Sequence, residues 1–256
     1  MVGSVLADEE SFHAAALIPV YDHEEAIGQT LQQVLEYDCP VLLVDDGSRE
    51  SCRRVLEALR DKYPERVSLL QLPRNAGKGA AVKAGFQALF DKGYSHAVQI
   101  DADGQHDISD LPEFLLQGEK YPHSLICGYP QFDENVPRMR FYFRYLTHVW
   151  VWINTLSFSI RDSMCGFRVY PLSAVMALIE KDDCGNRMAF DTEVIVRWSW
   201  RGGKIVSLPT RVGYPLDGVS HFLAWKDNLL ITQMHTRLFF GMLRRLPQIL
   251  GQRING

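Results

Sequence analysis

The feature that most constrains the fold is an alternation of short apolar runs with helical patterns in the first half of the chain. The apolar runs lie at residues 14–20, 41–44, 67–72, 96–100 and 125–128, and the helical patterns between them at 24–36, 49–62, 78–91 and 109–120. Buried parallel strands read as continuous apolar runs, joined by crossover helices. The alternation therefore predicts an α/β fold with an open, mostly parallel sheet flanked by helices.

Length and composition set limits on this fold. The 256 residues suffice for one large α/β domain, and the 46% of hydrophobic residues can fill a sizeable core. The net charge of -4 argues against a nucleic-acid-binding protein. The five cysteines are odd in number and scattered, which favours reduced thiols. Because the N-terminus also lacks a signal-peptide pattern, we expect a cytoplasmic protein.

The pattern changes after residue 129. Helical patterns occupy residues 138–160 and 190–201, short strand patterns occupy 167–170, ending at Pro171, and 204–208, and an amphipathic helical pattern runs from 224 to about 250. We divide the chain into a main domain at residues 1–223 and a C-terminal amphipathic helical appendage at 224–256. The apolar face and flanking arginines of the appendage suit a membrane interface, or equally packing on the domain or on a partner subunit. The oligomeric state is not predicted.

Polar motifs follow the first four predicted strands. In an open α/β sheet the carboxyl ends of parallel strands share one edge, where ligands bind. Four motifs that are far apart in sequence are therefore expected at one crevice. They are Pro-Val-Tyr-Asp-His-Glu at 19–24, Asp-Asp-Gly-Ser at 45–48, Asn-Ala-Gly-Lys-Gly at 75–79 and Asp-Ala-Asp-Gly-Gln at 101–105.

Asp101 and Asp103 give the sharpest chemical signal. Two carboxylates directly after a buried strand are costly unless their charge is used. Hard oxygen ligands suit Mg²⁺ or Mn²⁺, with water and phosphate oxygens in the remaining coordination positions. The competing interpretation is that the acids lie at the positive end of a helix dipole.

The second and third motifs indicate nucleotide binding. A carboxylate of Asp45 or Asp46 can accept hydrogen bonds from a ribose hydroxyl or a base N–H, although a tight turn capped by Ser48 also explains the motif. Backbone N–H groups around Gly77 at a helix start favour an anion, and Lys78 adds positive charge. A permissive turn is the alternative.

Several basic residues are candidates for binding a second, anionic substrate. Arg168 can bind a phosphate or pair with Asp162, and Arg140 and Arg144 share a helix face that suits a phosphate clamp, a membrane contact or a solvated surface. His221 can reach a phosphate or the metal, or be structural.

Two acids at the start of a later helix are candidates for a general base. A hydroxyl acceptor would need a carboxylate nearby, and Asp191 and Glu193 supply two. The alternative is that Asp191 caps the helix.

Taken together, the motifs resemble glycosyltransferase family 2, and within it the dolichyl- or polyprenyl-phosphate mannose synthase group. The resemblance covers residues 14 to 215 and includes Gly-Phe-Arg-Val-Tyr at 166–170. It implies a GT-A fold, a nucleotide-diphosphate sugar donor, a divalent metal and inversion at the anomeric carbon.

The resemblance also assigns roles to residues. Asp103 and Gln105 would serve the metal, and Arg140, Arg144 and Arg168 would hold an acceptor phosphate. The residues expected at the nucleotide are Pro19, Tyr21, Glu24, Asp45, Asp46, Gly77, Lys78, Asp101 and Ala102.

The resulting expectation is an inverting transfer to a lipid-linked or polyprenyl-phosphate acceptor by a protein that binds the cytoplasmic membrane face peripherally. Asp101, Asp103, Asp191 and Glu193 are the catalytic candidates. Transfer to a hydroxyl of a saccharide and a catalytically inactive nucleotide-sugar-binding protein remain alternatives. A sugar-phosphate nucleotidyltransferase is disfavoured because its basic, glycine-rich N-terminal loop is missing.

Overall fold

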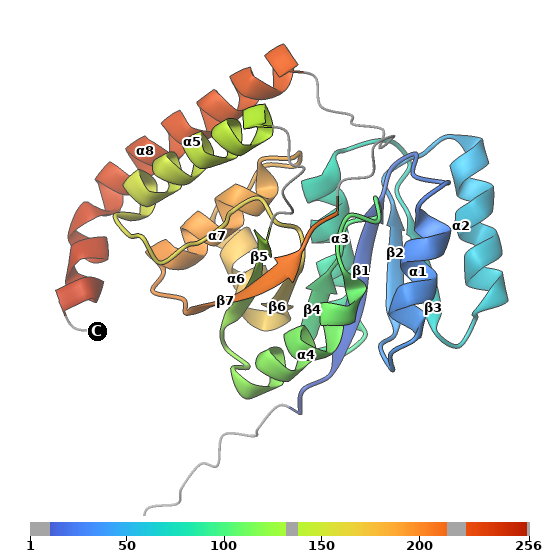
Figure 1. The fold of residues 1–256 in the computed structure, drawn as a ribbon. Coiled ribbons are helices and arrows are strands. Elements are labelled where there is room, and N and C mark those ends of the chain that lie inside the picture. Colours follow the sequence, from blue (N-terminus) through green and yellow to red (C-terminus); the bar gives the residue numbers. More distant parts are fainter. Residues whose placement is uncertain (1–10, 132–137, 214–223, 255–256) are drawn as a thin grey trace, which may run out of the picture.

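A computed structural model describes residues 11–131, 138–213 and 224–254 and contains one seven-stranded sheet (Figure 1). The sheet order is β3-β2-β1-β4-β6-β5-β7, and only β6 runs antiparallel to its neighbours. This mostly parallel sheet, flanked by helices, confirms the predicted fold class. The strands are β1 (Ala14–Val20), β2 (Val41–Asp45), β3 (Val67–Gln71), β4 (His96–Gln99), β5 (Leu125–Gln131), β6 (Arg168–Pro171) and β7 (Ile205–Arg211).

The described helices cover both faces of the sheet. Those found near their predicted positions are α1 (Ile27–Leu35), α2 (Glu50–Lys62), α3 (Lys78–Asp91), α4 (Leu111–Lys120), α5 (Arg138–Thr155), α7 (Phe190–Trp200) and α8 (Ala224–Ile254). A 3₁₀ turn, η1 (Ile108–Asp110), precedes α4. The helix α6 (Leu172–Lys181) was not predicted, because Pro171 was interpreted only as the end of a strand. Pro171 directly precedes the first turn of α6, where a missing N–H costs little.

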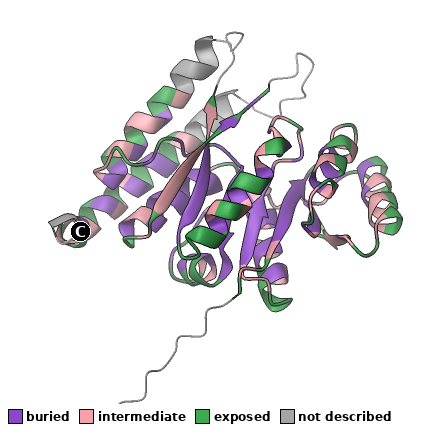
Figure 2. Ribbon diagram, turned by 60° about the horizontal axis from the view of Figure 1, so that its bottom comes forward, coloured by how far each residue is buried: buried purple, intermediate pink, exposed green. Residues whose placement is uncertain are grey.

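The strands divide their side chains between two hydrophobic cores. In β1, Ala15 and Leu17 face one core, while Ala16 and Ile18 face the other, as the two-residue period of a strand requires. The first core is closed by α3, α6 and α7, and the second by α1, α2 and α4. Both faces of the central strands are therefore buried, as Figure 2 shows.

The C-terminal helix α8 packs on α5 and α7 at one end of the molecule (Figure 1). Its inner face buries Met234, Leu238 and Met242 in the same core as the sheet. Asp182, which follows α6, accepts a hydrogen bond from Arg245 at 2.9 Å. The inner face of α8 thus forms part of the main core, and the domain boundary after residue 223 stays a prediction. No described helix has the length and hydropathy needed to span a membrane.

Truncating the buried side of α8 should cost much more stability than truncating its exposed side. Leu238 is fully buried, whereas Leu243 on the same helix is exposed. We expect Leu238→Ala to lower the free energy of unfolding by about 2–5 kcal/mol, the usual cost of a cavity left by a buried leucine. Leu243→Ala should change it by about 0.5 kcal/mol or less. Urea denaturation measures both; equal losses would show that α8 is not held by its inner face.

A buried histidine should make the packing of α8 on α5 sensitive to acid. Burial lowers the pKa of His235 to about 4, and Asn154 Nδ2 on α5 lies 3.3 Å from its Nδ1. The folded state therefore favours neutral His235, while the unfolded chain protonates it near pH 6.5. Stability from this residue is present above pH 6.5 and falls by about 3 kcal/mol as the pH drops to 4. Denaturation at several pH values should show a shallower decline for His235→Leu than for the parent.

Candidate active site

The four polar motifs meet at the carboxyl edge of β1 to β4, as the strand order requires. β1, β2, β3 and β4 are parallel neighbours, so the turns after them lie on the same side of the sheet. Gly47, in the turn after β2, has a φ of 70°, and a Cβ there would overlap the backbone of Arg74 and Asn75. The second motif therefore packs directly on the third, and only glycine permits that approach.

Asp46 holds the glycine-rich loop in place. Its Oδ1 accepts a hydrogen bond from Ala76 N at 2.8 Å, and its Oδ2 accepts one from Gly77 N at 2.8 Å and one from Asn75 Nδ2 at 3.1 Å. Burial raises the pKa of Asp46 from its ordinary value, although the two backbone N–H groups oppose the shift. The expectation that the Gly77 N–H binds an anion is therefore corrected, because this N–H already donates to a carboxylate.

Asp45 and Pro19 lie too deep to contact a ligand directly. Asp45 is fully buried; its Oδ1 accepts a hydrogen bond from Ser48 N at 2.8 Å, and its Oδ2 lies 3.5 Å from Arg53 Nε. Pro19 is buried within β1 opposite Val44. The expectation that they contact a nucleotide is therefore corrected. Pro19 has a structural role in the sheet, and Asp45 has one in the turn after β2.

Tyr21 and Glu24 remain at the accessible edge. Tyr21 is exposed, and Glu24 is half-buried with its Oε1 accepting a hydrogen bond from Ser51 Oγ at 3.0 Å. They lie directly after β1, the strand that neighbours both β2 and β4. This position suits both for contact with a ligand laid across the edge of the sheet.

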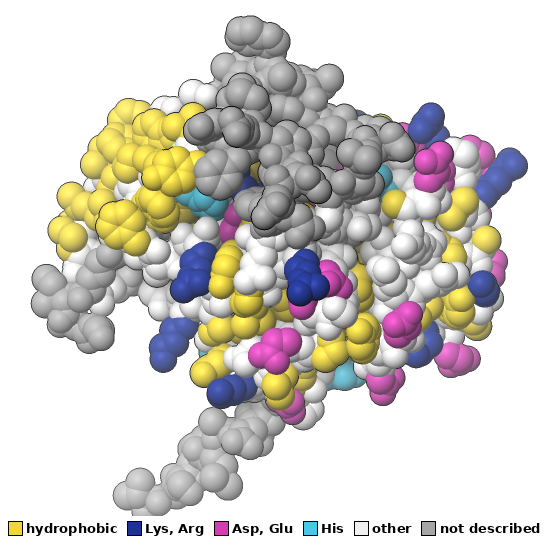
Figure 3. All heavy atoms as spheres, viewed as in Figure 1, with side chains coloured by type: hydrophobic (Ala, Val, Ile, Leu, Met, Phe, Trp, Pro, Cys, Tyr) yellow, Lys and Arg dark blue, Asp and Glu magenta, His cyan; other side chains and the backbone are white. Residues whose placement is uncertain are grey.

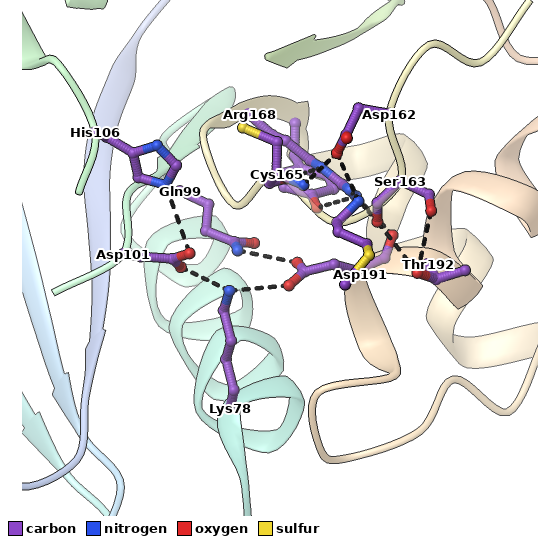
Figure 4. Close-up of polar contacts among 12 residues, drawn as sticks. Lys78, Gln99, Asp101, His106, Asp162, Ser163, Cys165, Arg168, Asp191 and Thr192 are labelled. Carbon is purple, nitrogen blue, oxygen red and sulfur yellow. Dashed lines mark hydrogen bonds and ion pairs between the residues drawn. The ribbon is translucent and has the colours of Figure 1, made fainter. Parts of the chain in front are cut away.

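Lys78 lies between two carboxylates at the centre of the site (Figure 4). Its Nζ is 2.6 Å from Asp101 Oδ1 and 2.9 Å from Asp191 Oδ2. Burial alone would lower the pKa of Lys78, but the two carboxylates more than offset it and hold the pKa above its usual range. Lys78 therefore binds protein carboxylates in this structure, whereas its motif predicts a contact with the nucleotide.

Asp101 is fixed by the residues around it. Its carboxylate packs on Gly166, where a Cβ would overlap it, and His106 Nε2 lies 3.5 Å from its Oδ2. Burial would raise the pKa of Asp101, yet Lys78 and His106 hold it well below its usual range. Asp101 is therefore ionised and pre-positioned.

Asp103 borders a small pocket beside Asp101. Its Oδ1 accepts a hydrogen bond from Gln105 N at 3.1 Å, and burial, followed by the charge of Asp101, raises its pKa. The pocket has a volume of about 70 Å³. Its lining includes Asp101, Asp103, Gln105, His106, Arg144 and Met164. The buried Ala102 lies between the two aspartates.

These residues fit a divalent cation that arrives with a phosphorylated ligand. Within residues 11–131, 138–213 and 224–254, no three His, Cys, Asp or Glu side chains form a metal cluster. Asp101, Asp103 and the Gln105 amide offer hard oxygen atoms at one pocket. Mg²⁺ is commonly held by one or two carboxylates plus water and substrate phosphates, so the set suits that kind of site.

The two candidate bases occupy different environments. Asp191 is buried, and its Oδ1 accepts a hydrogen bond from Gln99 Nε2 at 3.0 Å while its Oδ2 faces Lys78. Glu193 is fully buried, accepts a hydrogen bond from Gly185 N at 2.7 Å and pairs with Arg237 of α8. The expectation that Glu193 is a catalytic base is wrong for this geometry, because its carboxylate holds α7 to α8.

Arg168 binds the protein backbone. Its Nε donates to Cys165 O at 2.8 Å, its Nη1 to Asp191 O at 2.7 Å and its Nη2 to Ser163 O at 2.8 Å. The side chain is fully buried. The structure differs from both interpretations, because the buried guanidinium donates to three backbone carbonyl groups and the described contacts of Arg168 do not include Asp162.

Arg144 is the arginine that reaches the pocket. It borders the same cavity as Asp101 and Asp103, and its Nε lies 2.6 Å from Asp162 Oδ2. The side chain of Arg140, and residue His221, lie outside the described residues. Their expected roles at an acceptor stay predictions.

Three residues of the site were not selected from sequence: Gln99, His106 and Gly166. Gln99 interrupts the otherwise apolar end of β4, His106 directly follows the fourth motif, and Gly166 begins the Gly-Phe-Arg motif. Each position carried a signal, but only the fold shows that all three surround Asp101 and Asp191.

The fold is that of GT-A glycosyltransferase domains. A structure of glucosyl-3-phosphoglycerate synthase from Mycobacterium tuberculosis, solved with Mn²⁺, UDP-glucose and phosphoglyceric acid, has a TM-score of 0.66 at 13% identity and covers 91% of this chain and 79% of that one. A mannosyltransferase from Pyrobaculum calidifontis, solved with GDP-Man and Mn²⁺, has a TM-score of 0.56 at 12% identity, covering 94% and 73%. At these identities the likeness shows the fold alone.

The family follows from the sequence comparison. The model of glycosyl transferase family 2 matches residues 15–185, and the chain belongs to this family of glycosyltransferases. An uncharacterized protein of Methanocaldococcus jannaschii is 28% identical, covering 82% of this chain and 93% of its own. Human dolichyl-phosphate β-glucosyltransferase is 26% identical over 73% of this chain. A polyprenol monophosphomannose synthase of Mycolicibacterium smegmatis is 35% identical over 39% of this chain and 38% of its own.

The chain matches only 63% of the length of the human dolichyl-phosphate enzyme. The family and the enzyme class predicted from sequence are confirmed by these matches.

Removing the ammonium between the two carboxylates should destabilise the fold. In Lys78→Met, Asp101 and Asp191 face each other in a buried site without a cation, and we expect the free energy of unfolding to fall by about 3–5 kcal/mol. Adding Asp191→Asn removes one of the two charges and should recover part of the loss. Urea denaturation measures both variants. Unchanged stability in Lys78→Met would mean that the ion pairs do not hold the site.

Proposed function

We propose that this chain transfers a sugar from a nucleotide-diphosphate sugar to a polyprenyl-phosphate acceptor, with inversion at the anomeric carbon and with Mg²⁺ or Mn²⁺. The observation that carries the proposal is the composition of one pocket, where Asp101 and Asp103 lie beside Arg144. The acids suit a cation with a donor diphosphate, and the guanidinium suits an acceptor phosphate. Relatives named dolichyl-phosphate β-glucosyltransferase and polyprenol monophosphomannose synthase support that acceptor class.

The proposed roles follow the layout of the edge. Tyr21 and Glu24, which remain accessible, would contact the nucleoside, with Asp46 shaping the loop behind it. Asp103, with Asp101 and Gln105, would hold the cation. When bound, that cation would neutralise the charge that develops on the departing diphosphate.

The transfer is an in-line displacement. An oxygen of the acceptor phosphate forms a bond to the anomeric carbon, and the bond from that carbon to the diphosphate oxygen breaks, so the nucleoside diphosphate leaves with the electron pair. Arg144 would orient the acceptor phosphate opposite the leaving group, which gives inversion. Asp101 stays ionised throughout because Lys78 and His106 hold its pKa low.

The environments of the candidate bases favour a phosphate acceptor over a hydroxyl. A hydroxyl must lose a proton to a nearby base, whereas a phosphate is already anionic. Asp191 is occupied by Lys78 and Gln99, and Glu193 is buried against α8. Neither carboxylate is placed to take a proton from an incoming hydroxyl. We further propose that the protein works at the cytoplasmic face of a membrane, where such an acceptor resides.

The proposal can be tested with a donor panel and one matched pair of variants. Thermal shift with Mn²⁺ identifies the nucleotide sugar, since a bound ligand raises apparent stability. With that donor, we expect release of nucleoside diphosphate to depend on detergent-dissolved dolichyl or undecaprenyl phosphate. Asp103→Asn should lower kcat/KM by about 100-fold or more. Asp107→Asn should remain near the parent, because Asp107 caps η1 and does not line the pocket.

The same assay separates the alternatives. Sugar transfer to saccharide hydroxyls, with none to phosphates, would favour the hydroxyl-acceptor enzyme. Donor binding without turnover on any acceptor would indicate an inactive nucleotide-sugar-binding protein. A parental rate in Asp103→Asn would remove the proposed cation site.

A further inference from the structure

The glycine-rich loop before α3 lacks the positive charge that its motif suggests for a ligand. Lys78 is held between two carboxylates, and two backbone N–H groups of the loop donate to Asp46. A nucleotide-diphosphate donor on this edge carries negative charge on both of its phosphate groups. The proposed cation at Asp103 would offset part of that charge. A second positive group is therefore expected beside the loop.

The connection between α6 and α7 covers the glycine-rich loop, and its residues 183–189 are here named the 183–189 segment. Gly77 and Gly79 of the loop have no room for a Cβ, which would overlap the carbonyl oxygens of Asn186 and Gly185 respectively. Only glycine allows the segment to come this close to the loop. The segment therefore belongs to the same edge as the nucleotide motifs, although it lies far from them in sequence.

The backbone of the 183–189 segment is held from two sides. The helix α3 donates to it twice, from Ala80 N to Asn186 O at 3.0 Å and from Lys83 Nζ to Cys184 O at 2.8 Å. On the other side, a carboxylate of α7 accepts a hydrogen bond from Gly185 N at 2.7 Å. A side chain carried by this segment therefore starts from a defined point on the edge, as a binding residue must.

Arg187 is an exposed side chain of this segment. A Cβ at Gly77 would lie 2.8 Å from Arg187 Cγ, so the side chain begins directly over the loop. Burial raises the pKa of Asp46, and the charge of Arg187 is among the influences that oppose the rise, so the guanidinium acts on that carboxylate. The three donors of Asp46 come from the loop itself. Among the described residues, the Arg187 guanidinium has no ion pair or hydrogen bond.

The other arginines near this edge are less suited to the donor. Arg144 pairs with Asp162, and Arg168 donates to backbone carbonyl groups. Arg74 is exposed as well, but Arg187 is the arginine whose charge acts on Asp46. Figure 3 shows basic side chains scattered among acidic ones over the described part of one face of the molecule. Binding of an anion therefore depends on single side chains in the right place.

We propose that Arg187 binds a phosphate group of the nucleotide-diphosphate donor, an inference that rests on the proposed function. A guanidinium presents N–H groups in a planar fork that matches two phosphate oxygens. The charge of the diphosphate would then be shared by two groups. One is the cation at Asp103, in the turn after β4, and the other is Arg187, in the segment before α7.

The test measures the binding of UDP and GDP to the full chain by titration calorimetry, with Mn²⁺ and without an acceptor. The nucleotide that binds the parent more tightly is the probe. We expect Arg187→Ala to raise its Kd about 10- to 100-fold, the usual cost of losing a charged hydrogen-bond partner. Arg187→Lys keeps the charge without the fork and should recover part of the loss.

Arg244→Ala is the matched control, because it removes an exposed arginine near the C-terminal end of α8. It should bind the probe like the parent. Thermal denaturation without ligand checks that the variants fold. Parental binding in Arg187→Ala would overturn the inference and leave the donor site intact. A loss in Arg74→Ala with none in Arg187→Ala would overturn it in favour of Arg74.

The same titration in EDTA keeps this inference separate from the proposed function. The Arg187 contact needs no metal, so the difference between the parent and Arg187→Ala should persist there. If it persists while Asp103→Asn binds like the parent with Mn²⁺, the proposed cation site is rejected and the Arg187 contact stands. If the parent binds neither nucleoside diphosphate under either condition, the inference is rejected together with the donor on which it rests.

Discussion

The site depends on one ammonium group placed between two buried carboxylates. Lys78 begins α3, Asp101 follows β4 and Asp191 lies in the first turn of α7, so three elements far apart in sequence meet at this contact. Two uncompensated carboxylates this close in a buried site would repel each other strongly. The ammonium makes their approach possible, and the shape of the edge follows from it.

The ammonium itself depends on the loop before it. Gly77 has a φ of 102°, a backbone conformation that side chains rarely adopt, and a Cβ there would overlap Asn186 O. Asp46 then holds this loop by accepting the N–H groups of Ala76 and Gly77. One carboxylate therefore fixes the backbone, the backbone fixes Lys78, and Lys78 fixes Asp101. These acids build the site, whereas Asp103 and Gln105, beside them, border the pocket.

The elements and their shared edge could be predicted from sequence, but the pairing of the charges could not. The apolar run at β1 and the helical pattern at α3 predicted both elements with their observed limits. For the strand, burial on both faces of a parallel sheet leaves a strong local pattern of apolar residues. The family resemblance placed Arg168 at a phosphate, and the two acids at the start of a helix made Glu193 a candidate base for an acceptor. Both are buried against the protein, on contacts that join distant residues. Local patterns identify a charged residue, but only the fold decides whether its partner is a ligand or another part of the chain.

The pocket and the helix α5 are joined through a single carboxylate. Arg144 and His148, one turn apart on α5, both face Asp162 Oδ2, while Asp162 Oδ1 accepts the N–H groups of Met164 and Cys165. The next residue is Gly166, on which Asp101 packs. Burial would raise the pKa of Asp162, but His148 and Arg144 hold it well below its usual range. Because its pKa lies far below neutral pH, Asp162 stays ionised there. The stability that its ion pairs contribute is lost only when the pH falls towards that lowered pKa. The orientation of α5 is thus fixed relative to the acidic pocket by the same carboxylate that shapes the turn beside Asp101.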